Sequence, residues 1–121
     1  MKKYFFLVFI SLTAQAEAWK INGEQYQFVR VKEEILLAKC GQDKKMKCQA
    51  KDALDVVSME AINNMNAKAG TDRTGALCSS VKGTNVLGTD EKQNEDGFCL
   101  FKDGSVTSNH SLLVSARSRV K

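Results

Sequence analysis

The stretch DALDVVSMEAINNMNAKA, residues 52–69, shows the strongest helical pattern in the chain and predicts the centre of the fold. Leu54, Val57, Ala61 and Met65 recur at intervals of three and four positions, as residues on one face of a helix do. An aspartate at the start and a glycine just past the end are suitable helix caps. We therefore expect one long helix over residues 52–69.

Short β-hairpins are expected on both sides of this helix. Asn22-Gly23 separates two stretches of alternating apolar and polar residues, which predicts a hairpin over residues 18–31. Asp103-Gly104 forms a similar turn signal between expected strands at 98–102 and 105–108. Together these patterns predict an α+β fold in which one long helix packs on short antiparallel β-hairpins.

A polar stretch at 71–75, TDRTG, predicts a division of the chain into two units. Residues 17–70 would contain the first hairpin, a cysteine loop and the long helix. Residues 71–114 would contain a short helix at 76–82 and a second β-hairpin unit. The polar and basic residues 115–121 are expected to form a flexible tail.

Residues 1–16 have the pattern of a signal peptide. Lys2 and Lys3 precede an apolar run of about nine residues, and Ala14-Gln15-Ala16 supplies small residues for cleavage near Ala16. That run is too short to span a bilayer, and no later stretch approaches a transmembrane length. We expect a mature chain that is soluble and either periplasmic or secreted by a bacterium. Removal of both lysines lowers the formal net charge from +4 by two, and with export this argues against a nucleic-acid partner.

The four cysteines are expected to form disulfides, because export leads to an oxidising compartment. Four cysteines allow three pairings, and their spacing favours Cys40 with Cys48 and Cys78 with Cys99. Structural zinc sites usually place about two to four residues between paired ligands, and the intervals here are all longer. A C-x-x-C redox motif is absent from the sequence. We expect no metal site.

The stretches GALCSSVKG at 75–83 and GFCLFKDGS at 97–105 flank an acidic segment. This arrangement resembles a small bacterial domain of unknown function to which the label "hemolysin" is sometimes attached. The resemblance covers about residues 71–113. The matching residues are Cys78, Gly83, Gly97, Cys99, Asp103, Gly104 and Ser105.

The chain also departs from that family. Thr107 stands where the family usually has a third cysteine, His110 lies near the position of a tryptophan, and no final cysteine follows. Loss of two cysteines together corresponds to loss of one disulfide, so the resemblance favours pairing Cys78 with Cys99. The label implies membrane damage, but the mature chain has no long apolar or amphipathic segment suited to it.

Five lysines surround the first two cysteines and form the best candidate for an interaction surface. They are Lys39, Lys44, Lys45, Lys47 and Lys51. Within this stretch only Asp43 opposes them. A disulfide across the loop would hold the ammonium groups close together, where their shared field attracts anionic lipid headgroups, lipopolysaccharide or an acidic protein.

Other candidate groups fit ordinary structural roles. Trp19, Tyr26 and Phe28 are expected in the core of a small domain. His110 is expected at the surface, since no particular nucleophile or orienting partner accompanies it. The acidic residues within 90–97 lack the spacing of a calcium loop and are expected to form a solvated turn.

The function expected from the sequence is binding. No general acid–base pair, nucleophile dyad or metal cluster stands out, so we expect neither an enzyme nor a cofactor. We interpret the chain as an exported interaction module of the bacterial cell envelope or the extracellular space. Its partner, an envelope or extracellular protein or an anionic surface, would contact residues 39–51. The alternative is a secreted inhibitor of a protease or other hydrolase, because a closed loop presents a rigid segment at low ordering cost.

Overall fold

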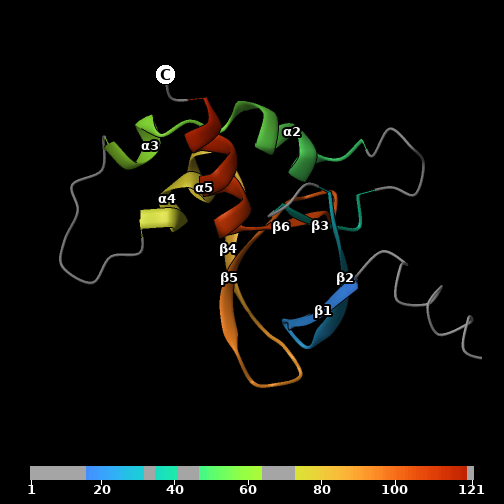
Figure 1. The fold of residues 1–121 in the computed structure, drawn as a ribbon. Coiled ribbons are helices and arrows are strands. Elements are labelled where there is room, and N and C mark those ends of the chain that lie inside the picture. The colour runs from blue at the N-terminus through green and yellow to red at the C-terminus, as the bar shows by residue number, and fades with distance from the viewer. Residues whose placement is uncertain (1–15, 32–34, 41–46, 64–72, 120–121) are drawn as a thin grey trace, which may run out of the picture.

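The computed structural model describes residues 16–31, 35–40, 47–63 and 73–119 (Figure 1). The expected signal peptide therefore lies outside the described residues, except for Ala16, which begins the first strand. Lys44 and Lys45 of the lysine cluster also lie outside them.

Six strands form a closed antiparallel barrel in the order β1-β2-β3-β6-β5-β4. The strands are β1 (Ala16–Ile21), β2 (Glu24–Arg30), β3 (Leu36–Ala38), β4 (Thr84–Thr89), β5 (Glu95–Leu100) and β6 (Val106–Ser108). Each half of the chain contributes a three-stranded meander, and the barrel closes where β1 pairs with β4 and β3 pairs with β6. The strands of the two expected units, 17–70 and 71–114, therefore belong to one sheet.

The expected α+β fold with one long helix packed on hairpins is wrong. The described part of 52–69 contains two short helices, α2 (Gln49–Val56) and α3 (Glu60–Asn63), and residues 64–69 lie outside the described residues. The helix ends because Val57 adopts an extended backbone with ψ 143°. The Ser58 hydroxyl then accepts a hydrogen bond from the Glu60 N–H at 3.1 Å, a local bond that replaces a helical one.

The barrel interior forms one of two hydrophobic cores. Phe28 and Phe98 are fully buried there, with ring centroids 5.1 Å apart. Tyr26 is also buried, and Trp19 is partly buried with its ring 5.0 Å from that of Phe98. The expected place of the aromatic residues in the core is therefore confirmed for Tyr26 and Phe28.

The second core lies between the barrel and the helices, which gather at one end of the barrel in Figure 1. Besides α2, it involves α4 (Arg73–Ser80) and α5 (Asn109–Ser118). The Cys78–Cys99 disulfide joins α4 to β5 inside this core, and both cysteines are fully buried. The chain therefore has two stacked apolar layers, one inside the barrel and one under the helices.

Residues 115–118 of the segment expected as a flexible tail, 115–121, belong to a helix. α5 extends to Ser118, and it buries Leu112 and Ala116 against the second core. The Arg119 guanidinium then donates hydrogen bonds to the carbonyl oxygens of Leu54 and Val57 at the end of α2. These bonds satisfy carbonyl groups that a helix leaves unpaired at its C-terminus, so Arg119 caps α2 from another helix.

Candidate functional site

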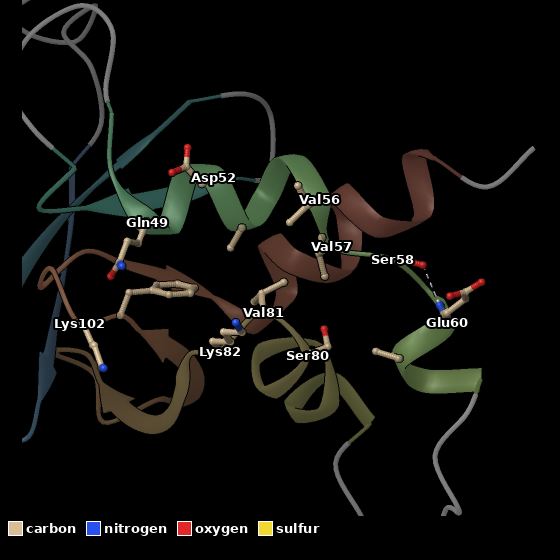
Figure 2. Close-up of a pocket in the computed structure, with 13 residues that line it drawn as sticks. Gln49, Asp52, Val56, Val57, Ser58, Glu60, Ser80, Val81, Lys82 and Lys102 are labelled. Atoms are coloured by element: carbon tan, nitrogen blue, oxygen red, sulfur yellow. Dashed lines mark hydrogen bonds between the residues drawn. The ribbon is translucent and has the colours of Figure 1, made fainter.

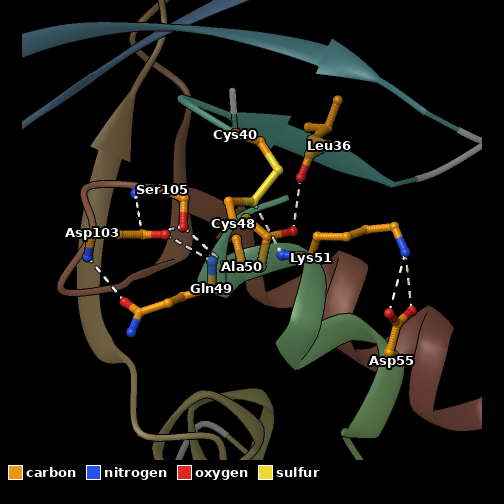
Figure 3. The surroundings of a disulfide bond; sticks show 10 residues. Leu36, Cys40, Cys48, Gln49, Ala50, Lys51, Asp55, Asp103 and Ser105 are labelled. Carbon is orange, nitrogen blue, oxygen red and sulfur yellow. Dashed lines mark hydrogen bonds and ion pairs between the residues drawn. A yellow bond between two sulfur atoms is a disulfide. The ribbon is translucent and has the colours of Figure 1, made fainter. Parts of the chain in front are cut away.

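The Cys40–Cys48 disulfide closes the lysine-bearing loop at its base (Figure 3). The two Cα atoms are 5.0 Å apart and both cysteines are buried. The structure thus contains the pairing that the spacing favours, here and at Cys78–Cys99. Cys48 is also the N-cap of α2, since its sulfur accepts the Lys51 N–H at 3.3 Å.

The β5–β6 turn fixes the start of α2 from the other side. The Asp103 carboxylate accepts the Gln49 N–H at 2.7 Å, and the Gln49 side-chain oxygen accepts the Asp103 N–H at 2.9 Å. The Ser105 hydroxyl oxygen accepts the Ala50 N–H at 2.9 Å (Figure 3). These bonds satisfy N–H groups that the first turn of a helix leaves unpaired. One end of the lysine loop is therefore attached to a fixed helix start.

The ionisation of Asp103 follows from this arrangement. Partial burial acts to raise the pKa of its carboxyl, but hydrogen bonds from the Ser105 hydroxyl and the Gln49 N–H favour the ionised form. The net result is a pKa below the ordinary value of an aspartate. Asp103 is thus held as the carboxylate that the helix start requires.

The described lysines of the cluster differ in their surroundings. Lys39 forms an ion pair with Glu24 and lies over the Tyr26 ring, 4.5 Å from its centroid. Its hydrogen bond to Glu24 raises the pKa of Lys39 above the usual value. Lys51 pairs with Asp55 at 3.0 Å, one helical turn away. Lys47 is exposed. Because Lys39 and Lys51 are each paired with a carboxylate, the three lysines do not form one unopposed positive patch.

The residues that match the "hemolysin"-labelled domain have structural roles. Asp103 and Ser105 cap α2, and Gly104 has φ +89°, which suits the turn between them. Gly83 lies against the Cys78–Cys99 disulfide, where an added Cβ would approach the Cys78 sulfur to 2.9 Å and the Cys99 sulfur more closely still. These residues of the motif therefore account for part of the fold.

A groove of about 860 Å³ lies beside α2, and the sequence analysis did not identify it (Figure 2). Buried side chains of Ala53, Val57 and Phe101 line it, together with the partly buried Val81. Val56 is also in the lining and is 68% exposed. The available sequence signal was this valine, which is apolar although it lies off the main stripe of the helix.

Charged side chains stand around the same groove. Lys82 follows α4, and Lys102 belongs to the β5–β6 turn. Asp52 and Glu60 come from the α2 and α3 side, and Figure 2 shows Asp52 pointing away from Lys82 and Lys102. Within the described ranges, no ion-pair partner is found for any of these four groups.

The described part of the chain shows neither a metal-ligand cluster nor a membrane-spanning helix. Residues 16–31, 35–40, 47–63 and 73–119 hold no group of three potential metal ligands. In the same residues, no helix is long and apolar enough to cross a membrane.

The acidic segment forms a turn that Asp90 organises. The Asp90 carboxylate accepts the Lys92 and Asn94 N–H groups at 2.9 Å each. His110 is exposed on α5.

No protein-family model matches this chain, and neither does any curated protein or solved structure. The resemblance to the "hemolysin"-labelled domain therefore depends on the matching residues alone.

Proposed function

We propose that the chain is an exported interaction module of the bacterial cell envelope or the extracellular space, which contacts an anionic partner beside the Cys40–Cys48 disulfide. The supporting observation is the fixed base of this loop. Its ends are joined by a buried disulfide, with Cα atoms 5.0 Å apart, and the helix that follows is capped by the β5–β6 turn. A loop with a fixed base loses less conformational freedom on binding.

The ion pairs indicate which lysines contribute most to such a contact. Lys39 and Lys51 each have a carboxylate at hand, and a new anionic partner would compete with it. The attraction is therefore assigned mainly to Lys44, Lys45 and Lys47. Export is supported by the signal-peptide pattern together with two disulfides, which persist in oxidising compartments.

The proposal is tested by replacing Lys44, Lys45 and Lys47 with serine. A matched control removes the same charge elsewhere, at the exposed Lys20, Lys92 and Arg117. We expect the loop variant to lose capture of partners from native envelope extract at moderate salt, because salt screens the little attraction that remains. The control variant keeps the loop lysines, so its capture should persist at the same salt. Capture that is unchanged in partner and in salt sensitivity would show that the loop is not the contact.

Protease inhibition is the second candidate, and the same disulfide-closed loop favours it. A segment with joined ends 5.0 Å apart suits a protease cleft, and Lys44 or Lys45 suits enzymes that cleave after basic residues. The oxidised protein should then inhibit a trypsin-like protease at micromolar concentration. Cleavage of a chromogenic substrate at an unchanged rate would exclude this function for that class of protease.

A further inference from the structure

We infer that the groove beside α2 binds an extended peptide segment of a partner protein, in which apolar side chains alternate with carboxylates. The inference rests on the proposed function in one respect, namely the negative charge of the partner. The groove itself consists of described residues only, and apart from Gln49 its lining lies outside residues 39–51.

The apolar part of the groove accounts for the apolar half of the ligand. Val56 is 68% exposed, beside the buried side chains of Val57 and Phe101. An apolar side chain laid over these residues would remove the Val56 surface from water, which is favourable in proportion to the area covered. The volume of about 860 Å³ is within the range of about 300–1,000 Å³ that ligand sites occupy.

Two of the four charged residues around the groove account for the carboxylates; the other two, Asp52 and Glu60, come from its α2 and α3 side. Lys82 and Lys102 both line the side of the groove opposite α2, and neither has an ion-pair partner among the described residues. Lys39 and Lys51, by contrast, are paired within the chain. Long lysine side chains can cover apolar surface with their stems while the ammonium group stays at the rim, so both can reach carboxylates of a bound segment.

The position of the groove favours an extended ligand that continues toward the lysine loop. Gln49 lines the groove and directly follows Cys48, and Lys47 is exposed on the other side of that cysteine. A segment that leaves the groove at Gln49 therefore reaches Lys47, beside the Asp103 carboxylate that accepts the Gln49 N–H. In an extended chain successive side chains point to opposite sides, which places apolar groups over Phe101 and carboxylates at the rim.

Solution NMR with the oxidised, exported form of the protein tests the inference. The probe is an acetylated, amidated peptide that alternates leucine and glutamate. Amide shifts are expected at groove residues 49–61, 80–82 and 101–102. Peptides with lysine in place of glutamate, or serine in place of leucine, should bind at least about tenfold more weakly, because each loses one of the two complementary surfaces. Equal affinity of all three peptides, or chemical-shift changes only at other residues, would overturn the inference.

Variants separate the groove from the lysine loop. Val56→Asp should weaken binding of the probe about tenfold or more by placing a carboxylate on the apolar surface, whereas Leu87→Asp, at a 57% exposed position on β4, should leave it unchanged. Lys82→Ser with Lys102→Ser should weaken binding and reduce its salt dependence. Equal binding by Val56→Asp and Leu87→Asp would overturn the inference.

The lysine-loop variant distinguishes the two proposals. Lys44→Ser with Lys45→Ser and Lys47→Ser should keep the shifts at residues 80–82 and 101–102, because these residues do not depend on the loop. If that variant loses envelope capture and the probe also fails to bind the wild-type groove, the proposed function stands and the groove inference fails. If the probe binds and envelope capture is unaffected, the groove inference stands and the loop is not the contact.

Discussion

The two disulfides lie in different surroundings, although each joins cysteines that are close in sequence. Cys78–Cys99 connects α4 to β5 in the interior, at a sequence separation of 21, and both cysteines are fully buried. Cys40–Cys48, at a separation of 8, closes a loop at the edge of the second core and begins α2. The first therefore holds together two elements of the core, whereas the second joins the two ends of the lysine-bearing segment. Stability should depend more on the first, and recognition more on the second.

The largest effect is expected from removing the interior disulfide. Cys78→Ala with Cys99→Ala should lower the free energy of unfolding by about 3–5 kcal/mol, because the unfolded chain gains freedom and a buried site loses its sulfur atoms. Urea unfolding followed by tryptophan fluorescence measures this through Trp19, which lies against Phe98. A loss smaller than that from removing Cys40–Cys48 would contradict the comparison.

Removing the edge disulfide should have a smaller effect on stability and a larger one on binding. Cys40→Ala with Cys48→Ala should lower the unfolding free energy by about 2–3 kcal/mol, as the chain-entropy relation gives for a short loop. Capture of envelope partners should weaken at a temperature where circular dichroism shows the variant to be folded, because the loop ends are no longer held. A folded variant that binds as wild type does would contradict the assigned role of this disulfide.

Local signals in the sequence account for the features that were predicted correctly. Asn22 and Gly23 both adopt positive φ, at 54° and 83°, and join β1 to β2 as expected. Both disulfides join cysteines that are neighbours among the four. These features depend on a few adjacent residues, whose preferences are visible in the sequence alone.

Features that depend on distant residues were missed. β3 contains three residues, all buried, so it lacks the alternation that identifies a strand. The pairings of β1 with β4 and of β3 with β6 that close the barrel join residues far apart in sequence. The apolar pattern of 52–69 predicted a helix that continues past Val57. Such a pattern gives no information about local hydrogen bonds, such as the one that Ser58 accepts from Glu60. The groove depends on Phe101 and Lys82 meeting α2, which the sequence does not show.

The interior disulfide can also be disturbed without breaking it. Gly83→Ala should lower the unfolding free energy by about 1–3 kcal/mol, because its Cβ would overlap both sulfur atoms and also lie 3.2 Å from the Phe101 ring. Gly75→Ala is the control, since its Cβ would meet only the Asn85 side chain, at 3.3 Å. Thermal unfolding of the two variants measures the difference. Equal melting temperatures would show that the core accommodates the added methyl group at the disulfide.

The smallest effect is expected at the start of α2, next to the edge disulfide. Asp103→Ala should lower the unfolding free energy by about 1 kcal/mol, because the Gln49 N–H loses its acceptor. Hydrogen bonds hold the pKa of the Asp103 carboxyl below its ordinary value of 3.8. This contribution to stability is therefore complete above that pH and is lost as the pH falls through the lower, folded-state pKa. Urea unfolding of wild type and Asp103→Asn across this range should therefore show a stability difference that shrinks as the solution becomes more acidic. A difference that stays constant down to about pH 2 would mean that the charge of Asp103 does not stabilise the helix start.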